Sequence, residues 1–135
     1  MKRLEDGTGW LGFANDDLRV GRLALEGGIF NMACFHAQQA AEKSLKGLLK
    51  GKGKDIVRTH SLLELARSCA ASGEPEPDMK EACRYLDRFY AATRYPDAFP
   101  GTLEDRMPAK HEAEKAMALA EGIYEKAWKA LKEKE

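Results

Sequence analysis

The segment RYPDAFP, residues 94–100, holds the densest group of side chains that could carry out chemistry. Arg94 lies at the end of a predicted helix, and Tyr95 and Asp97 lie in the loop just beyond it. An arginine in this position can hold a phosphate group bidentately while Tyr95 or Phe99 stacks on a base. Alternatively, Arg94 pairs with Asp97, caps the helix end and holds the loop in place. The segment indicates either a ligand site or a structural cap.

Basic side chains earlier in the chain form a second candidate group. Its members are Lys43, Lys46, Lys50, Lys52, Lys54, Arg58 and His60. The glycine-containing loop in the middle of this group lacks the pattern G-x-x-x-x-G-K-[ST], so nucleotide binding cannot be read from it directly. We expect these residues either to form a local patch for a nucleotide or RNA, or to form a solvated face. His60 either bonds to nearby backbone or contacts the ligand.

The overall charge limits the possible partners. The chain of 135 residues has 22 basic and 22 acidic side chains, so no net field steers the whole molecule toward nucleic acid. Any nucleic-acid site must therefore be a local patch. No run of about 18 apolar residues and no N-terminal signal pattern is visible, so we expect a cytoplasmic protein with no membrane partner.

The cysteines and histidines do not have the spacing of a metal site. Cys34, Cys69 and Cys83 are an odd number, and each lies in a predicted helix, which favours buried free thiols. The pair Cys34-x-His36 points to different sides of a helix and makes a poor chelate. We therefore expect no metal site and no cofactor.

The stretch from Phe30 to Leu49 organises the rest of the chain. Its apolar residues recur at the three-and-four spacing of one helix face, and its many alanines allow another helix to approach closely. The pattern places the polar residues on the rest of the surface, namely Gln38, Gln39, Glu42, Lys43 and Lys46. Glu42 and Lys46 are spaced for a helical ion pair.

Four further helices are expected around this central one. The first covers residues 9–25 and pairs antiparallel with it, because the glycines at 27 and 28 leave only a short turn. Ser61 and Glu64 form a capping box for a helix that ends at Gly73, and Asp78 and Glu81 form another for a helix that ends near residue 95. Pro108 opens the last helix, whose predicted apolar side is Ala113, Ala116, Met117, Ala120, Ile123, Tyr124, Ala127, Trp128 and Leu131. Because no strand pattern occurs, we predict a single all-α domain over residues 1–135, an antiparallel bundle of four to five helices.

Three short motifs occur along this predicted bundle. They are QQAAEKxxK at residues 38–46, THSL at 59–62 and TRYPD at 93–97. In this order they resemble the HEPN domain (higher eukaryotes and prokaryotes nucleotide-binding), and the resemblance covers nearly the whole chain. It implies an antiparallel helical bundle that is often a homodimer. It also implies a possible partner, because such stand-alone domains are frequently encoded beside a minimal nucleotidyltransferase as a toxin–antitoxin-like pair.

Many HEPN domains are metal-independent ribonucleases with an R-x4-6-H motif, in which histidine moves a proton and arginine stabilises the phosphorane charge. Arg94 matches the arginine, but the four-residue spacing ends at Phe99, which cannot transfer a proton. Arg106 and His111 match the same spacing later than the family pattern expects.

Three hypotheses follow from these motifs. The leading one is a dimeric module that binds a nucleotide or RNA and a nucleotidyltransferase. The alternatives are a metal-independent endoribonuclease, using Arg94 or Arg106 with His111 or His60, and a purely structural dimerisation domain.

Overall fold

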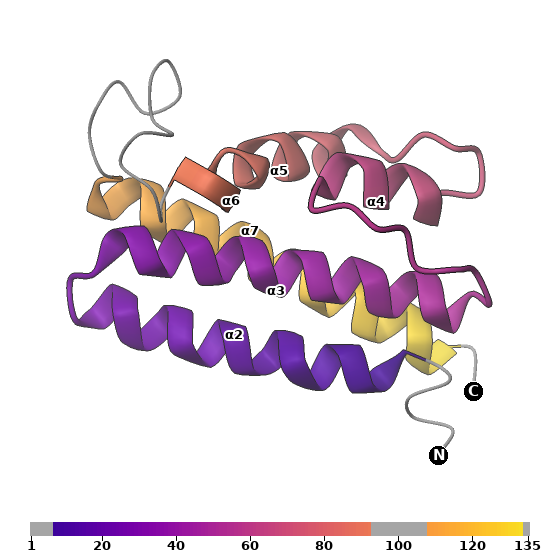
Figure 1. Ribbon diagram of the computed structural model, residues 1–135, viewed down its shortest axis with the longest axis horizontal. Coiled ribbons are helices and arrows are strands. Elements are labelled where there is room, and N and C mark those ends of the chain that lie inside the picture. The colour runs from indigo at the N-terminus through magenta and orange to yellow at the C-terminus, as the bar shows by residue number, and fades with distance from the viewer. Residues whose placement is uncertain (1–6, 93–107, 134–135) are drawn as a thin grey trace.

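The computed structural model describes residues 7–92 and 108–133, and every regular element in these two ranges is a helix (Figure 1). The helices are α2 (Thr8–Glu26), α3 (Phe30–Gly51), α4 (Leu62–Cys69), α5 (Pro77–Asp87), α6 (Phe89–Ala92) and α7 (Lys110–Glu133). The predicted all-α helical bundle is confirmed. Over the described ranges, no helix is long and apolar enough to cross a membrane.

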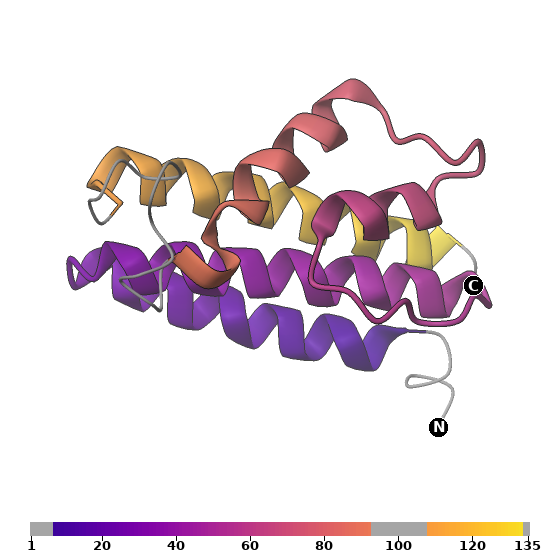
Figure 2. The same ribbon diagram turned by 45° about the horizontal axis from the view of Figure 1, so that its top comes forward.

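Three long helices form the body of the bundle. α2 and α3 are antiparallel across the short turn that contains Gly28, whose φ is 78°, and α7 packs against both of them (Figure 1). The shorter helices α4, α5 and α6 lie over α3 on the side away from α2 (Figures 1 and 2). α3 is therefore covered on several sides, as its predicted central position requires.

Small residues on α3 let its neighbours approach closely. Ala33, Ala37, Ala40 and Ala41 are all fully buried. Near the other end of α3, a Cβ added to Gly47 would lie 2.8 Å from the carbonyl oxygen of Gly7, which precedes α2. A side chain at residue 47 would thus push the start of α2 away from α3.

The apolar interior consists of two clusters. The larger one contains buried residues from each of the helices α2 to α7, with Phe89 as the member from α6. A small second cluster lies where the start of α2 meets the end of α7, and its buried members are Leu11, Ala127 and Leu131. All three cysteines are buried free thiols, as predicted, and burial raises their pKa to about 12 for Cys34, about 11 for Cys69 and about 12 for Cys83.

The structure corrects the predicted boundaries of α4. Ser61 Oγ accepts a hydrogen bond from Glu64 N at 3.2 Å, which confirms half of the capping box. The other half is absent, because Ser61 N donates to Thr59 Oγ1 at 3.1 Å instead. The prediction that this helix ends at Gly73 is wrong, because the backbone of Ala70 is already extended and α4 ends at Cys69.

The fourth predicted helix differs at both ends. It begins at Pro77, before the predicted cap Asp78, because the fixed φ of proline suits the first turn of a helix. It does not run on toward residue 95 as one helix. α5 ends at Asp87, and the chain then forms the short α6, which places the fully buried Phe89 in the core.

Two predicted surface assignments are also wrong. The helical spacing predicts Gln38 and Glu42 on the polar surface of α3, but their exposed fractions are 0% and 6% because α4 and the segment before it cover that side. The same kind of spacing predicts Trp128 on the apolar side of α7, but it is 39% exposed.

Candidate functional site

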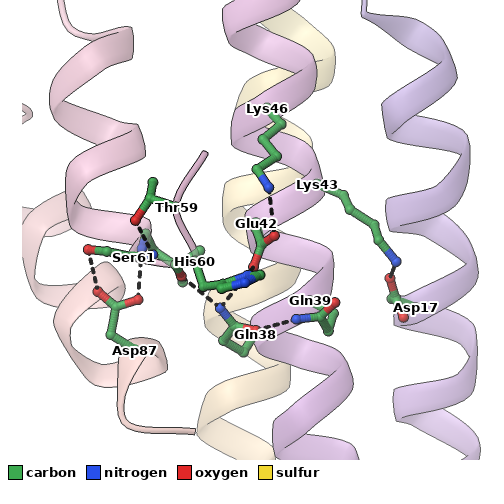
Figure 3. A network of polar contacts seen from close by, with 11 residues as sticks. Asp17, Gln38, Gln39, Glu42, Lys43, Lys46, Thr59, His60, Ser61 and Asp87 are labelled. Atoms are coloured by element: carbon green, nitrogen blue, oxygen red, sulfur yellow. Dashed lines mark hydrogen bonds and ion pairs between the residues drawn. The ribbon is translucent and has the colours of Figure 1, made fainter. Parts of the chain in front are cut away.

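The polar residues of α3 point toward two different neighbours. Gln38, Glu42 and Lys46 are spaced four residues apart and lie on the side of the segment that precedes α4 (Figure 3). Lys43 points the other way, toward Asp17 of α2 (Figure 3). α3 therefore carries two separate polar clusters rather than one continuous basic patch.

Glu42 is the centre of the first cluster, and we call this the Glu42 cluster. Its Oε2 accepts from Lys46 Nζ at 2.9 Å, which confirms the predicted ion pair. Its Oε1 lies 3.3 Å from His60 Nδ1 and 3.4 Å from Gln38 Nε2. Because Glu42 is nearly fully buried, these three partners offset the cost of removing its charge from water.

His60 is the exposed member of the Glu42 cluster. Its ring stacks on Tyr90 of α6, with 4.2 Å between the ring centroids and 16° between the planes. Gln38 Nε2 also donates to the backbone oxygen of His60 at 3.1 Å. The ring is thus held by Glu42 and Tyr90 and the backbone by Gln38, yet the His60 side chain is 57% exposed. With Nδ1 facing Glu42, Nε2 is the ring nitrogen that can reach a ligand.

Lys46 is less available to a ligand than its sequence position implies. Its side chain is only 12% exposed. Besides its ion pair with Glu42, its ammonium group lies 5.9 Å from the centre of the Trp10 ring in α2. Its positive charge is therefore already balanced within the fold.

The second cluster joins α2 to α3. Asp17 Oδ2 accepts from Lys43 Nζ at 2.6 Å, and Asp17 Oδ1 lies 2.8 Å from His36 Nδ1. Burial alone would raise the pKa of Asp17, but the hydrogen bonds from His36 and Lys43 outweigh this effect, so the pKa is lowered. Lys43 thus holds two helices together.

Asp87, the last residue of α5, caps α4. Its carboxylate accepts from Leu62 N at 2.7 Å and from Leu63 N at 3.3 Å. It also accepts from Ser61 Oγ at 3.4 Å (Figure 3). Burial raises the pKa of Asp87, and the two backbone hydrogen bonds offset part of that increase. This contact fixes the end of α5 beside the segment that carries His60.

The lysines of the loop after α3 also have partners. Lys52 Nζ donates to the carbonyl of Cys69 at 2.6 Å, and Lys54 Nζ donates to that of Ser68 at 2.7 Å. Both carbonyls lie at the C-terminal end of α4, where the helix dipole favours a cation. Arg58 is exposed.

The described structure places only some of the predicted site residues. Arg94, Tyr95, Asp97, Phe99 and Arg106 lie outside the described residues. α6 ends at residue 92, two positions before the first of them.

Among the residues that are described, the fold brings Lys46 and His60 together at Glu42. Lys43 faces a different helix, and His111 is an exposed residue of the first turn of α7. Within residues 7–92 and 108–133, no group of three or more His, Cys, Asp or Glu side chains is placed to hold a metal ion.

Several members of these clusters have no local signal in the sequence. Asp17, His36 and Asp87 belong to no motif, and their partners lie 19 to 26 residues away along the chain. The helical spacing predicts Tyr90 only as part of an inward-facing stripe, but its ring supports His60.

The all-α bundle is the fold of a known domain family. The family described as "HEPN domain" matches residues 8–131, so this chain belongs to the HEPN family, as its motifs predict.

Relatives agree with this assignment. The chain is 28% identical over 130 residues to a protein of Methanocaldococcus jannaschii named "Putative toxin MJ1304", covering 90% of this chain and 85% of that one. It resembles the crystal structure of TT1696 from Thermus thermophilus with a TM-score of 0.83 and 37% identity, over 93% of this chain and 98% of that one. It also resembles ST0689, an archaeal HEPN homologue, with a TM-score of 0.76 and 30% identity, over 93% and 97% of the two chains.

Proposed function

We propose that this chain is a HEPN binding and interaction module that binds a nucleotide or RNA and pairs with a minimal nucleotidyltransferase. A relative that carries the name of a toxin supports a toxin–antitoxin-like role. The observation that carries the binding proposal is the exposed His60 imidazole, held between the buried Glu42 carboxylate and the Tyr90 ring.

The chain order strengthens this assignment. Tyr90 contacts His60, and the TRYPD motif begins three residues after Tyr90. Arg94 would supply a bidentate contact to a phosphate group, and Tyr95 an aromatic face for a base. Asp97 would orient Arg94. Arg58, exposed two residues before His60, would add a second positive charge beside the ligand.

The binding proposal can be tested with a short fluorescent single-stranded RNA and with ATP. We expect His60→Ala and Arg94→Ala each to weaken binding of one of these ligands about tenfold, the loss of one charge-assisted or stacking contact. The exposed Lys129→Ala on α7 is the matched control. If both site variants bind as tightly as the wild type, this surface is not the ligand site.

The partner and the dimer need separate tests. Co-expression with a minimal nucleotidyltransferase followed by size-exclusion chromatography should give a joint complex. A homodimer is supported by exposed apolar side chains on one side of α2 and the turn after it, at Phe13, Val20, Leu23 and Ile29. A stable dimer that binds neither RNA nor ATP would instead favour the purely structural hypothesis.

A second candidate function is a metal-independent endoribonuclease. It is favoured by the His60–Glu42 pair, because a carboxylate-oriented histidine with a free ring nitrogen can act as a general acid or base. Cleavage in EDTA that disappears in His60→Ala or His111→Ala would support it, with Arg94→Ala and Arg106→Ala testing charge stabilisation. Cleavage that survives substitution of His36, His60 and His111 would exclude it.

A further inference from the structure

A groove lies between α5 and α7. Its volume is about 630 Å³. It is lined by Asp78, Glu81, Ala82, Arg84 and Tyr85 of α5, by Arg88 directly after α5, and by Lys115 and Leu119 of α7. No part of the groove belongs to the Glu42 cluster, so it is a separate feature of the surface.

The ring of Tyr85 gathers two cations at one end of this groove. Lys115 Nζ lies 4.5 Å from the ring centroid and Arg88 Cζ lies 5.0 Å from it, both within cation–π range. The ring itself is fixed, because Tyr85 Oη donates to the backbone oxygen of Glu112 at 3.3 Å. Arg88 directly follows α5 and Lys115 lies in α7, so the packing of these segments is what brings the two cations to one ring.

One ion pair offsets part of the positive charge at this end of the groove. Arg88 Nη2 is 3.7 Å from Glu112 Oε2, a loose contact. Within the described part of the chain, neither Arg84 nor Lys115 has a carboxylate partner. Like charges gathered in this way repel one another unless an anion joins them.

The neighbouring residues extend the basic end. Arg84 lies four residues before Arg88, whose backbone is still in the helical region at the end of α5, and His111 precedes Lys115 by one turn of α7. The two members of each pair therefore lie on one side of their helix. The acidic lining residues, Asp78 and Glu81, lie toward the start of α5, away from Arg88. The groove thus has an acidic end and a basic end.

We propose that the basic end of this groove binds a phosphoryl group, contributed by a nucleotide or by the RNA backbone. Two guanidinium groups and an ammonium group can share the several oxygens of one phosphoryl group, whereas a carboxylate would satisfy a single arginine fork. The apolar lining at Ala82 and Leu119 leaves room for the rest of the ligand. This site goes beyond the proposed function, which places ligand contacts at His60 and Arg94.

Titration calorimetry on the full chain tests the proposal with three probes: pyrophosphate, AMP and a short single-stranded RNA. We expect Lys115→Glu to weaken binding at least tenfold, and Arg84→Ala to weaken it less. Lys129→Glu, an exposed charge reversal on the same helix, should leave binding unchanged. Circular dichroism melting curves would show that each variant is folded. Binding by Lys115→Glu at wild-type affinity, or no binding of any probe to the wild type, overturns the proposal.

The probes also identify the source of the phosphoryl group. Lys115-dependent binding of pyrophosphate and AMP supports a free nucleotide, and Lys115-dependent binding of RNA alone supports the backbone. His60→Ala and Arg94→Ala separate this site from the other one. RNA binding lost in those two variants but kept in Lys115→Glu overturns the groove and leaves the proposed function standing. RNA binding that is lost in Lys115→Glu but kept in His60→Ala and Arg94→Ala supports the groove as the ligand site and excludes the surface at His60.

Discussion

Replacing Asp87 by alanine should destabilise the bundle, because this residue of α5 caps the N-terminus of the eight-residue helix α4. The change removes the acceptor for Leu62 N at 2.7 Å and for Leu63 N at 3.3 Å. Loss of a helix N-cap costs about 0.5–2 kcal/mol, and a hydrogen bond to a charged group is worth about 1.5–3 kcal/mol. Against this, the variant no longer buries a carboxylate whose pKa is raised by desolvation. We therefore expect a net loss of about 1–3 kcal/mol in the free energy of unfolding.

Urea unfolding followed by circular dichroism measures this loss. Asp78→Ala is the matched control, because Asp78 is an exposed acid in the first turn of α5, and it should change stability by about 0.5 kcal/mol or less. Asp87→Asn keeps one acceptor oxygen and should fall between the two. A loss for Asp87→Ala no larger than that for Asp78→Ala would refute the capping role.

The same residue makes a prediction about pH. Because the pKa of Asp87 is raised in the folded state, its protonated form is favoured there. This contribution is fully present below the ordinary aspartate pKa of about 3.9 and is lost as the pH rises through the folded value. The side chain in Asp87→Asn does not titrate, so its contribution to stability does not change with pH. The amount by which the free energy of unfolding of this variant falls below that of the wild type should therefore narrow as the pH rises. A difference in the free energy of unfolding that widens with rising pH would contradict the raised pKa of Asp87.

Three further predictions concern other parts of the molecule. Because the pKa of Asp17 is lowered, its stabilising contribution is present above about pH 3.9 and is lost as the pH falls; Asp17→Asn should therefore flatten the acid side of the stability curve measured by urea unfolding at several pH values. The thiols of Cys34, Cys69 and Cys83 should react with Ellman's reagent at a rate set by unfolding, and fast labelling of the native protein would contradict their burial. The proposed homodimer predicts that Leu23→Glu shifts the protein toward the monomer in sedimentation experiments. Because Leu23 is 68% exposed, the substitution should change monomer stability by about 0.5 kcal/mol or less.

Features that depend on one helix alone were predictable from the sequence. The extent of α3, its buried alanines and the Glu42–Lys46 ion pair all follow from spacing within a single element. So does the Ser61 cap of α4.

Features that depend on what covers a helix were not predictable in this way. Gln38 is polar, and only the packing of the segment before α4 shows that it is buried and bonded to the His60 carbonyl. The division between α5 and α6 was missed because the apolar spacing continues from Leu86 to Phe89 and Tyr90. The Asp87 cap joins residues 25 apart along the chain, and no local pattern encodes that distance.

The small apolar cluster between the start of α2 and the end of α7 bears on how the molecule opens. Leu11, Ala127 and Leu131 form their own cluster, which meets the main core only through the partly buried Leu48 and Tyr124. The first turn of α2 and the last turns of α7 can therefore separate while the larger cluster stays packed. Backbone amides there should exchange with deuterium through local opening, well before amides in the middle of α3. We therefore expect amide exchange in the centre of α3 to require global unfolding. Exchange at the junction of α2 and α7 should require only local opening of these helix ends.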